Sequence, residues 1–127
     1  MTRIRTAIID YKMGNIWSLT NALDYLKKDY QLISEPDKLR NFTHILLPGV
    51  GSAREAFERL SSSGFAEKIK ECVLKDGIML FGICVGMQLL GSSTEEDGGS
   101  ECLNFFENKV KKLKINQETK LPHVGFN

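Results

Sequence analysis

A cysteine between two glycines, at the junction of an apolar run and a short helical pattern, constrains this chain most. The run Ile78–Phe81 contains no polar residue, which is typical of a strand buried on both faces. The stretch 85–90 is apolar at four positions and lacks proline, which favours a short buried helix. The sequence therefore predicts Cys84 on a sharp strand-to-helix turn flanked by Gly82 and Gly86, the cysteine form of a nucleophile elbow.

Such a turn presents the cysteine thiol at the carboxyl end of a strand. The start of the following helix brings backbone N–H groups and a positive dipole end beside the sulfur, and both favour the nucleophilic thiolate. The alternative is a small buried core cysteine, which is a common role for a free cysteine. The two glycines and the predicted strand and helix together favour a functional Cys84.

Composition excludes several other classes of protein. The chain has 127 residues, 42% of them apolar and 26% charged, which predicts one small globular domain. Its net charge of +1 gives no electrostatic case for binding nucleic acid or a membrane surface. Cys72, Cys84 and Cys102 show neither metal-ligand spacing nor a disulfide framework, so a reducing cytoplasm is expected and no metal or organic cofactor is implied. The first residues lack a secretory apolar region, and no apolar run is long enough to cross a bilayer.

Predicted strands and helices alternate along most of the chain. Strands are expected at 6–10, 30–33, 45–47 and 78–81, and helices at 16–27, from 53 to about 60, and at 65–75. Apolar strands in this order predict an α/β fold with a parallel sheet covered on both faces. The stretch 92–100 is polar and predicts a loop, and 109–115 predicts an edge strand with its lysines outward.

Three segments should meet at the carboxyl edge of that sheet. Residues 10–15, 48–51 and 84–88 each follow a predicted strand, and sites in open parallel sheets lie at this edge. The segment 48–51, Pro-Gly-Val-Gly, is a glycine-rich loop. The capping box formed by Ser52 and Glu55 then predicts that the next helix begins at Ala53.

Four motifs, in order, span the chain and carry a resemblance. They are Ile-Asp-Tyr-x-Met-Gly-Asn at 9–15, Leu-Pro-Gly-Val-Gly at 47–51, Gly-Ile-Cys-Val-Gly-Met-Gln-Leu-Leu at 82–90 and Pro-His-Val-Gly-Phe-Asn at 122–127. With them the chain resembles class I glutamine amidotransferases, especially the glutaminase subunit of imidazole glycerol phosphate synthase or its surface-polysaccharide sugar-amidotransferase relatives. The resemblance implies a flavodoxin-like three-layer sandwich with a mostly parallel sheet. Residues 1–127 would be the N-terminal part of one such domain, incomplete at its C-terminal side.

The resemblance also implies a reaction. Cys84 would attack the side-chain amide of glutamine, forming a thioester and releasing ammonia. The backbone N–H of Val85 and the loop carrying Val50 and Gly51 would hold the oxyanion, with a peptide flip that brings in Val50.

The substrate-binding role of the family falls on three further residues. These are Gly49, Gln88 and Glu96, and the Glu96 carboxylate would hold the substrate ammonium group. Relatives commonly have glycine where Cys102 and Asn104 stand, which puts the nearby loop shape in question.

A partner is implied by the same resemblance. The ammonia would pass into a barrel-shaped cyclase or synthase subunit, with which the chain would form a heterodimer. The partner-facing positions would be Tyr11, Asn15, His123 and Asn127. Nucleic acid and membrane are not expected partners, and the expected location is the cytoplasm.

The chain departs from the family at the catalytic base. The family uses a histidine with a glutamate two residues later. The two histidines here, His44 and His123, are followed at that spacing by Leu46 and Gly125. We therefore expect little or no glutaminase turnover from the 127-residue polypeptide.

Two other interpretations stay open. The first is a non-catalytic subunit that keeps the partner-facing surface and binds or regulates a synthase. The second is an unrelated elbow-cysteine hydrolase built on a similar sheet. The Pro48–Gly51 loop and the motif at 122–127 argue against the second alternative.

Overall fold

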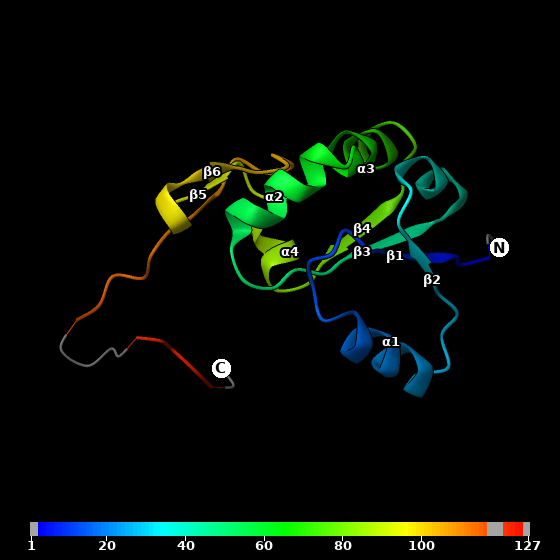
Figure 1. Ribbon diagram of the computed structural model, residues 1–127, viewed down its shortest axis with the longest axis horizontal. Helices are drawn as coiled ribbons and strands as arrows, with labels where there is room; N and C mark the ends of the chain where they lie inside the picture. The colour runs from blue at the N-terminus through cyan, green and yellow to red at the C-terminus, as the bar shows by residue number, and fades with distance from the viewer. Residues whose placement is uncertain (1–2, 117–120, 126–127) are drawn as a thin grey trace.

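A parallel four-stranded sheet forms the centre of the computed structural model, which describes residues 3–116 and 121–125 (Figure 1). The strand order is β2-β1-β3-β4, the beginning of the flavodoxin-like order. The bounds are β1 Thr6–Ile9, β2 Gln31–Ile33, β3 His44–Leu47 and β4 Met79–Gly82. The α/β fold with a parallel sheet is confirmed, and the four strands expected at 6–10, 30–33, 45–47 and 78–81 lie within one residue of their predicted bounds.

Helices occupy both sides of this sheet. Helix α1 spans Ile16–Tyr25 and lies on one side, whereas α2 (Ala53–Ser62) and α3 (Phe65–Leu74) lie on the other (Figure 1). A short 3₁₀ helix, η1 (Pro36–Asn41), joins β2 to β3, and the one-turn helix α4 (Val85–Gln88) follows β4. Helix α2 begins as predicted, because Ser52 accepts a hydrogen bond from the Glu55 amide at 3.3 Å. The Glu55 carboxylate binds Arg59 instead of completing the capping box.

The hydrophobic core lies between the sheet and the α2/α3 layer. Its side chains come from alternate strand positions and from one face of each helix. Fully buried examples are Ile9, Ile45, Leu47, Leu60 and Ile69. Cys72 lies in this core, as expected of a small apolar side chain.

The α1 side of the sheet is less covered than the sequence predicts. Ile8 is buried there, but Leu32, Met79 and Phe81 are 49%, 63% and 63% exposed. Because β4 is the edge strand and its side chains Met79 and Phe81 are largely exposed, the expectation of a strand buried on both faces is wrong for the described residues. Helix α1 likewise buries no residue completely, and Leu26, its C-cap residue, is 59% exposed.

A small second sheet replaces the loop expected at 92–100. Strands β5 (Ser93–Thr94) and β6 (Ser100–Glu101) form an antiparallel pair around the short 3₁₀ helix η2 (Glu96–Gly98). Strand β7 (Lys109–Val110) pairs with β5 in parallel, so the predicted strand at 109–115 is shortened to two residues. Strands of two residues leave little apolar periodicity in a sequence, and for this reason the polar stretch 92–100 predicted a loop.

Asn104, one of the two positions at which the resemblance predicts glycine, has a φ of 58°. Asparagine tolerates this left-handed region better than most residues, so the turn keeps a conformation that glycine would favour.

Among the described residues, no helix is long and apolar enough to cross a membrane.

Candidate functional site

Cys84 occupies a strained turn between β4 and α4. Its φ of 56° and ψ of −118° are unusual for a residue with a Cβ, and its side chain is exposed. The predicted elbow is therefore present. Cys72 and Cys102 are buried, and burial raises the pKa of both thiols.

Close backbone packing explains the glycines at the elbow. A Cβ on Gly86 would lie 1.9 Å from the Leu47 carbonyl oxygen, and one on Gly82 would lie 2.6 Å from the Gly86 carbonyl oxygen. A side chain at either position would force β3, β4 and α4 apart. The elbow geometry thus depends on these two glycines.

The Pro48–Gly51 loop lies directly against the elbow. A Cβ on Gly49 would lie 2.8 Å from the Gly86 amide nitrogen and 3.0 Å from the Val85 Cβ atom. The amides of Gly49, Val50 and Gly51 donate no hydrogen bond within the described residues. The loop therefore offers unused N–H donors beside the cysteine turn.

Val85 supplies a further unused donor. Its side chain is buried, and it is the first residue of α4, where an amide has no partner inside the helix. The next amide, that of Gly86, bonds the Ile83 carbonyl at 3.0 Å. The Val85 N–H is left unpaired within the described chain, as an oxyanion donor must be.

Gln88 and Glu96 line one hollow of about 450 Å³. The Gln88 Oε1 atom is buried and accepts no hydrogen bond within the described residues. Buried polar atoms are rarely left unpaired, so this oxygen marks a position where a ligand donor would be stabilised. Cys84 is not among the lining residues of the hollow.

Local contacts hold the loop that carries Glu96. The buried Thr94 hydroxyl accepts the Glu96 amide at 3.1 Å, and the Arg54 guanidinium donates to the Asp97 carbonyl at 3.4 Å. Lys111 and Lys112 of the β7 segment also line the hollow, and Lys111 lies 3.9 Å from Glu95. Sequence reasoning missed Arg54 and both lysines, because they reach this loop only through tertiary contacts. It also missed Thr94, because a hydroxyl contact two residues along the chain leaves no periodic pattern.

The residues expected at a partner interface lie in different surroundings. Tyr11 is only 5% exposed, so its side chain is not on the surface, contrary to expectation. Its aromatic ring packs in the core, and its hydroxyl donates to the Pro48 carbonyl at 2.6 Å. Asn15 is exposed and caps α1 by accepting the Ser18 amide at 3.1 Å. His123 is exposed, and Asn127 lies outside the described residues.

His44 does not lie near the elbow. It is the first residue of β3, and its ring nitrogen Nδ1 lies 2.9 Å from the Thr43 hydroxyl. Strand β3 runs four residues from His44 toward Pro48, a length of about 10 Å at the usual rise per residue. This histidine is therefore at the amino end of the sheet, whereas Cys84 is at the carboxyl end.

The fold and site define a class: an α/β protein with a cysteine elbow beside a glycine-rich loop whose amides are unpaired among residues 3–116 and 121–125. A family model described as a CobB/CobQ-like glutamine amidotransferase domain matches residues 6–119. The chain belongs to this glutamine amidotransferase family, and the resemblance inferred from its motifs is confirmed.

Curated relatives agree. The chain is 40% identical over 124 residues to "Imidazole glycerol phosphate synthase subunit HisH" of Bacillus licheniformis, covering 94% of this chain and 58% of that protein. It is 42% identical over 120 residues to the protein of that name from Caldanaerobacter subterraneus, covering 94% and 58%. The chain thus spans somewhat over half the length of these relatives. A solved glutamine amidotransferase with 18% identity matches with a TM-score of 0.69, over 83% of this chain and 55% of that one, and supports the fold.

Proposed function

We propose that this chain carries the glutamine-hydrolysing chemistry of an imidazole glycerol phosphate synthase. The observation that supports it best is the position of an exposed elbow cysteine beside two sets of backbone amides that are unpaired in the part of the chain that the structure describes. The names of the relatives point to the same synthase. Histidine biosynthesis in the cytoplasm would then be the pathway and its location.

In the proposed reaction the Cys84 sulfur attacks the side-chain amide carbon of glutamine. The carbonyl oxygen becomes negatively charged, and the N–H groups of Val85 and Val50 stabilise it. The C–N bond then breaks and nitrogen leaves with a proton as ammonia, so that a thioester remains. Water attacks the thioester carbon, releases glutamate and returns the thiol. Gly49, Gly51, Gln88 and Glu96 would bind the substrate or shape its pocket.

The Gln88 and Glu96 hollow fits this proposal chemically. The Gln88 oxygen has no donor among the described residues, and a glutamine substrate has an ammonium group and an amide that can donate. Glu96 is an exposed carboxylate on the same hollow. A ligand that donates to both side chains would supply the hydrogen bond that the buried Gln88 oxygen lacks within the described residues, and it would also pair with the negative charge of Glu96.

A chloroketone analogue of glutamine tests the nucleophile. Its methylene carbon accepts the Cys84 sulfur and chloride leaves, giving a fixed mass increase. We expect labelling at Cys84 alone, with a rate that saturates and is slowed by glutamine, and no labelling of Cys84→Ser. Iodoacetamide serves as the general thiol control. Labelling by iodoacetamide but not by the chloroketone would instead favour an unrelated elbow-cysteine hydrolase.

The partner proposal is that ammonia enters a barrel-shaped synthase subunit in a heterodimer. It rests on the synthase named for the relatives and on the motifs at 9–15 and 122–127. Asn15 and His123 are exposed and could contact such a partner. Co-purification with a barrel subunit tests this part, and binding without any glutaminase activity would favour the non-catalytic alternative.

Turnover by the 127-residue polypeptide alone should be small. His44 lies at the wrong end of the sheet, and neither histidine has an acidic residue two positions later. We expect ammonia release far below the ~1–10³ s⁻¹ usual for enzymes, even where the chloroketone labels Cys84. Glutamine hydrolysis at an ordinary enzymatic rate by the purified polypeptide would show that a base has been overlooked.

A further inference from the structure

The buried hydroxyl of Tyr11 has no role in the reaction described above. It donates at 2.6 Å to the carbonyl of Pro48, which is 37 positions away in the sequence. The side chain is 5% exposed, and its burial raises the pKa of the phenol well above its usual range. The hydroxyl is therefore a permanently protonated donor at physiological pH.

The contact divides the Pro48–Gly51 loop into two unlike halves. Pro48 and Gly49 are buried, and a Cβ on Gly49 would lie 3.0 Å from the Tyr11 hydroxyl oxygen. Val50 is 46% exposed, and a Cβ on Gly51 would meet no described atom within 4 Å. Pro48 and Gly49 are therefore held by contacts on several sides, whereas Val50 and Gly51 have room to move.

The segment before α1 also packs against Pro48. A Cβ on Gly14 would lie 3.0 Å from the Pro48 Cβ atom, and Gly14 has a φ of 129° that strongly favours glycine. Tyr11 and Gly14 thus contact Pro48 from the same segment, the one that the family resemblance places toward the partner. A displacement of this segment would be transmitted directly to the Pro48–Gly49 peptide.

We propose that Tyr11 is a positioning residue that anchors the Pro48–Gly49 peptide and confines loop rotation to the Gly49–Val50 peptide. The anchor keeps the unpaired Val50 amide close to the elbow while leaving it free to turn toward an oxyanion. Tyr11 acts through the loop and does not touch substrate. This inference rests on the proposed function for its catalytic consequence but not for the anchoring itself.

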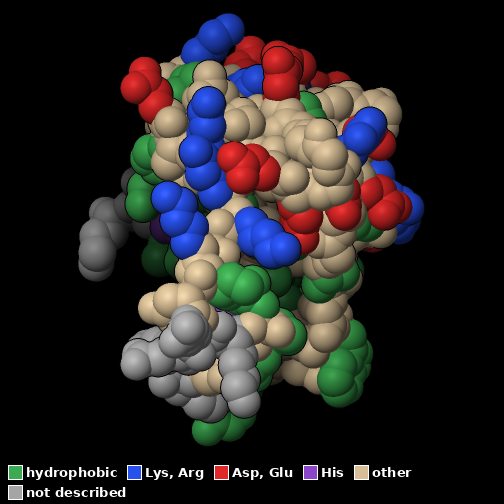
Figure 2. All heavy atoms as spheres, turned by 90° about the vertical axis from the view of Figure 1, so that its left-hand side faces the viewer, with side chains coloured by type: hydrophobic (Ala, Val, Ile, Leu, Met, Phe, Trp, Pro, Cys, Tyr) green, Lys and Arg blue, Asp and Glu red, His purple; other side chains and the backbone are tan. Residues whose placement is uncertain are grey.

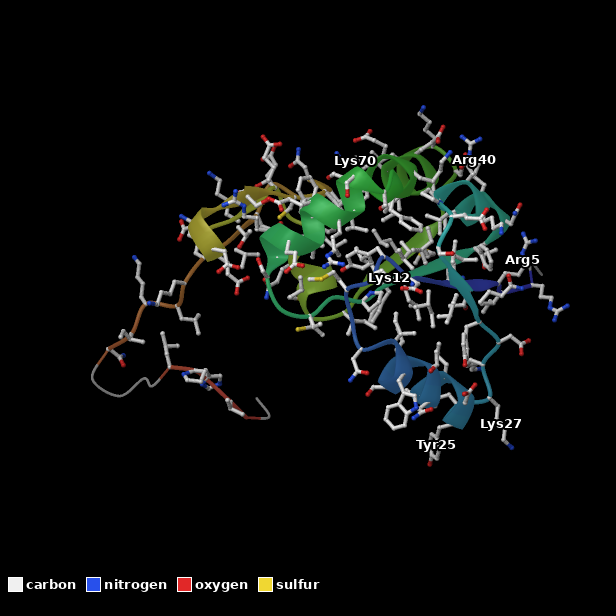
Figure 3. All side chains as sticks on the ribbon, viewed as in Figure 1. Arg5, Lys12, Tyr25, Lys27, Arg40 and Lys70 are labelled. Atoms are coloured by element: carbon white, nitrogen blue, oxygen red, sulfur yellow. The ribbon has the colours of Figure 1, made fainter. Side chains whose placement is uncertain are left out.

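A selective label isolates the anchored peptide. Pro48–Gly49 is the single Pro-Gly pair in the sequence. Carbonyl-¹³C proline combined with ¹⁵N glycine therefore yields one carbonyl–amide correlation in an NMR spectrum. We expect Tyr11→Phe, which removes only the hydroxyl, to shift the Pro48 carbonyl resonance and broaden the Gly49 amide. The control Tyr25→Phe changes an 87% exposed ring that points away from the sheet (Figure 3) and should leave the signal unchanged.

An unchanged correlation in Tyr11→Phe would overturn the proposal. If that variant does not fold, the unsubstituted chain still tests it, because microsecond-to-millisecond exchange should appear at Val50 and Gly51 but not at Gly49. Exchange at Gly49 as large as that at Val50 would contradict an anchor at this peptide.

The consequence for the reaction is measured with the chloroketone. Losing the anchor should lower the maximal labelling rate of Cys84 about fivefold, the equivalent of one ordinary hydrogen bond, with the half-saturating concentration unchanged. The iodoacetamide rate should stay constant, whereas a general loss of structure would change both. If the unsubstituted chain is not labelled saturably, the proposed function fails while the NMR result still decides the anchor.

Discussion

At the scale of single residues, the site depends on positions where a side chain cannot fit. Gly86 and Gly82 allow β3, β4 and α4 to pack backbone to backbone, and this packing holds Cys84 in its left-handed turn. The exposed thiol follows from that packing, as do the amides of Val50 and Val85, which have no acceptor within the described chain. The chemistry of the site is therefore set by backbone geometry more than by charged side chains.

Gly86→Ala should destabilise the fold. The new methyl group would lie 1.9 Å from the Leu47 carbonyl oxygen, and the obstacle is backbone that cannot rotate away. We expect a loss of ~3 kcal/mol, at the upper end of overpacking, measured by urea unfolding. Gly125→Ala is the matched control, because its Cβ would meet no atom of the described residues within 4 Å. Equal stability of the two variants would show that the close approach is absent in solution.

At the scale of elements, ion pairs fasten η1 to the outer face of α3. Lys68 on α3 binds Asp37 of η1 at 2.9 Å and Glu71 at 3.2 Å. Arg40 of η1, which is labelled in Figure 3, also binds Glu71. Hydrogen bonds from Lys68 lower the pKa of both Asp37 and Glu71 below their ordinary values.

These lowered pKa values predict an acid-sensitive contribution to stability. The carboxyls of Asp37 and Glu71 bind protons more readily in the unfolded state than in the folded state. Their contribution to the stability of the fold is therefore present above their ordinary pKa values, and it is lost as the pH falls through their lowered pKa values in the folded state. Lys68→Met should therefore reduce the difference in Tm between pH 7 and pH 3. Lys70→Met is the control, since Lys70 lies 3.9 Å from a Glu67 that is 87% exposed. An unaltered pH dependence in Lys68→Met would mean that solvent screens the cluster completely.

At the scale of the whole molecule, the two sides of the sheet differ in character. Figure 2 shows charged side chains over the upper part of the molecule, on the side of α2 and α3, and apolar ones gathered lower down toward α1. The exposed apolar side chains include Met79 and Phe81 on β4 and Trp17 on α1. Patches of this kind promote association between molecules, and an edge strand adds unpaired backbone groups.

Replacing Met79 and Phe81 together by lysine should reduce self-association of the 127-residue chain. Both side chains are 63% exposed, so charging them costs little internal packing. Sedimentation velocity at increasing concentration should show a lower average mass for the double variant. Leu74→Lys, at a 72% exposed position on α3, is the control. The same mass in all three proteins would show that this face does not drive association.

The order of strands and helices, the elbow and the family follow from the sequence, because each depends on local patterns. Apolar runs mark the strands, Ser52 starts α2, and glycines around Cys84 mark a turn that few other residues allow. The buried role of Tyr11, the exposure of β4 and the small sheet that carries Glu96 were decided by tertiary structure alone. A hydrogen bond between residues 37 positions apart, or a face left uncovered, depends on which elements meet in space, and a one-dimensional pattern holds no record of that.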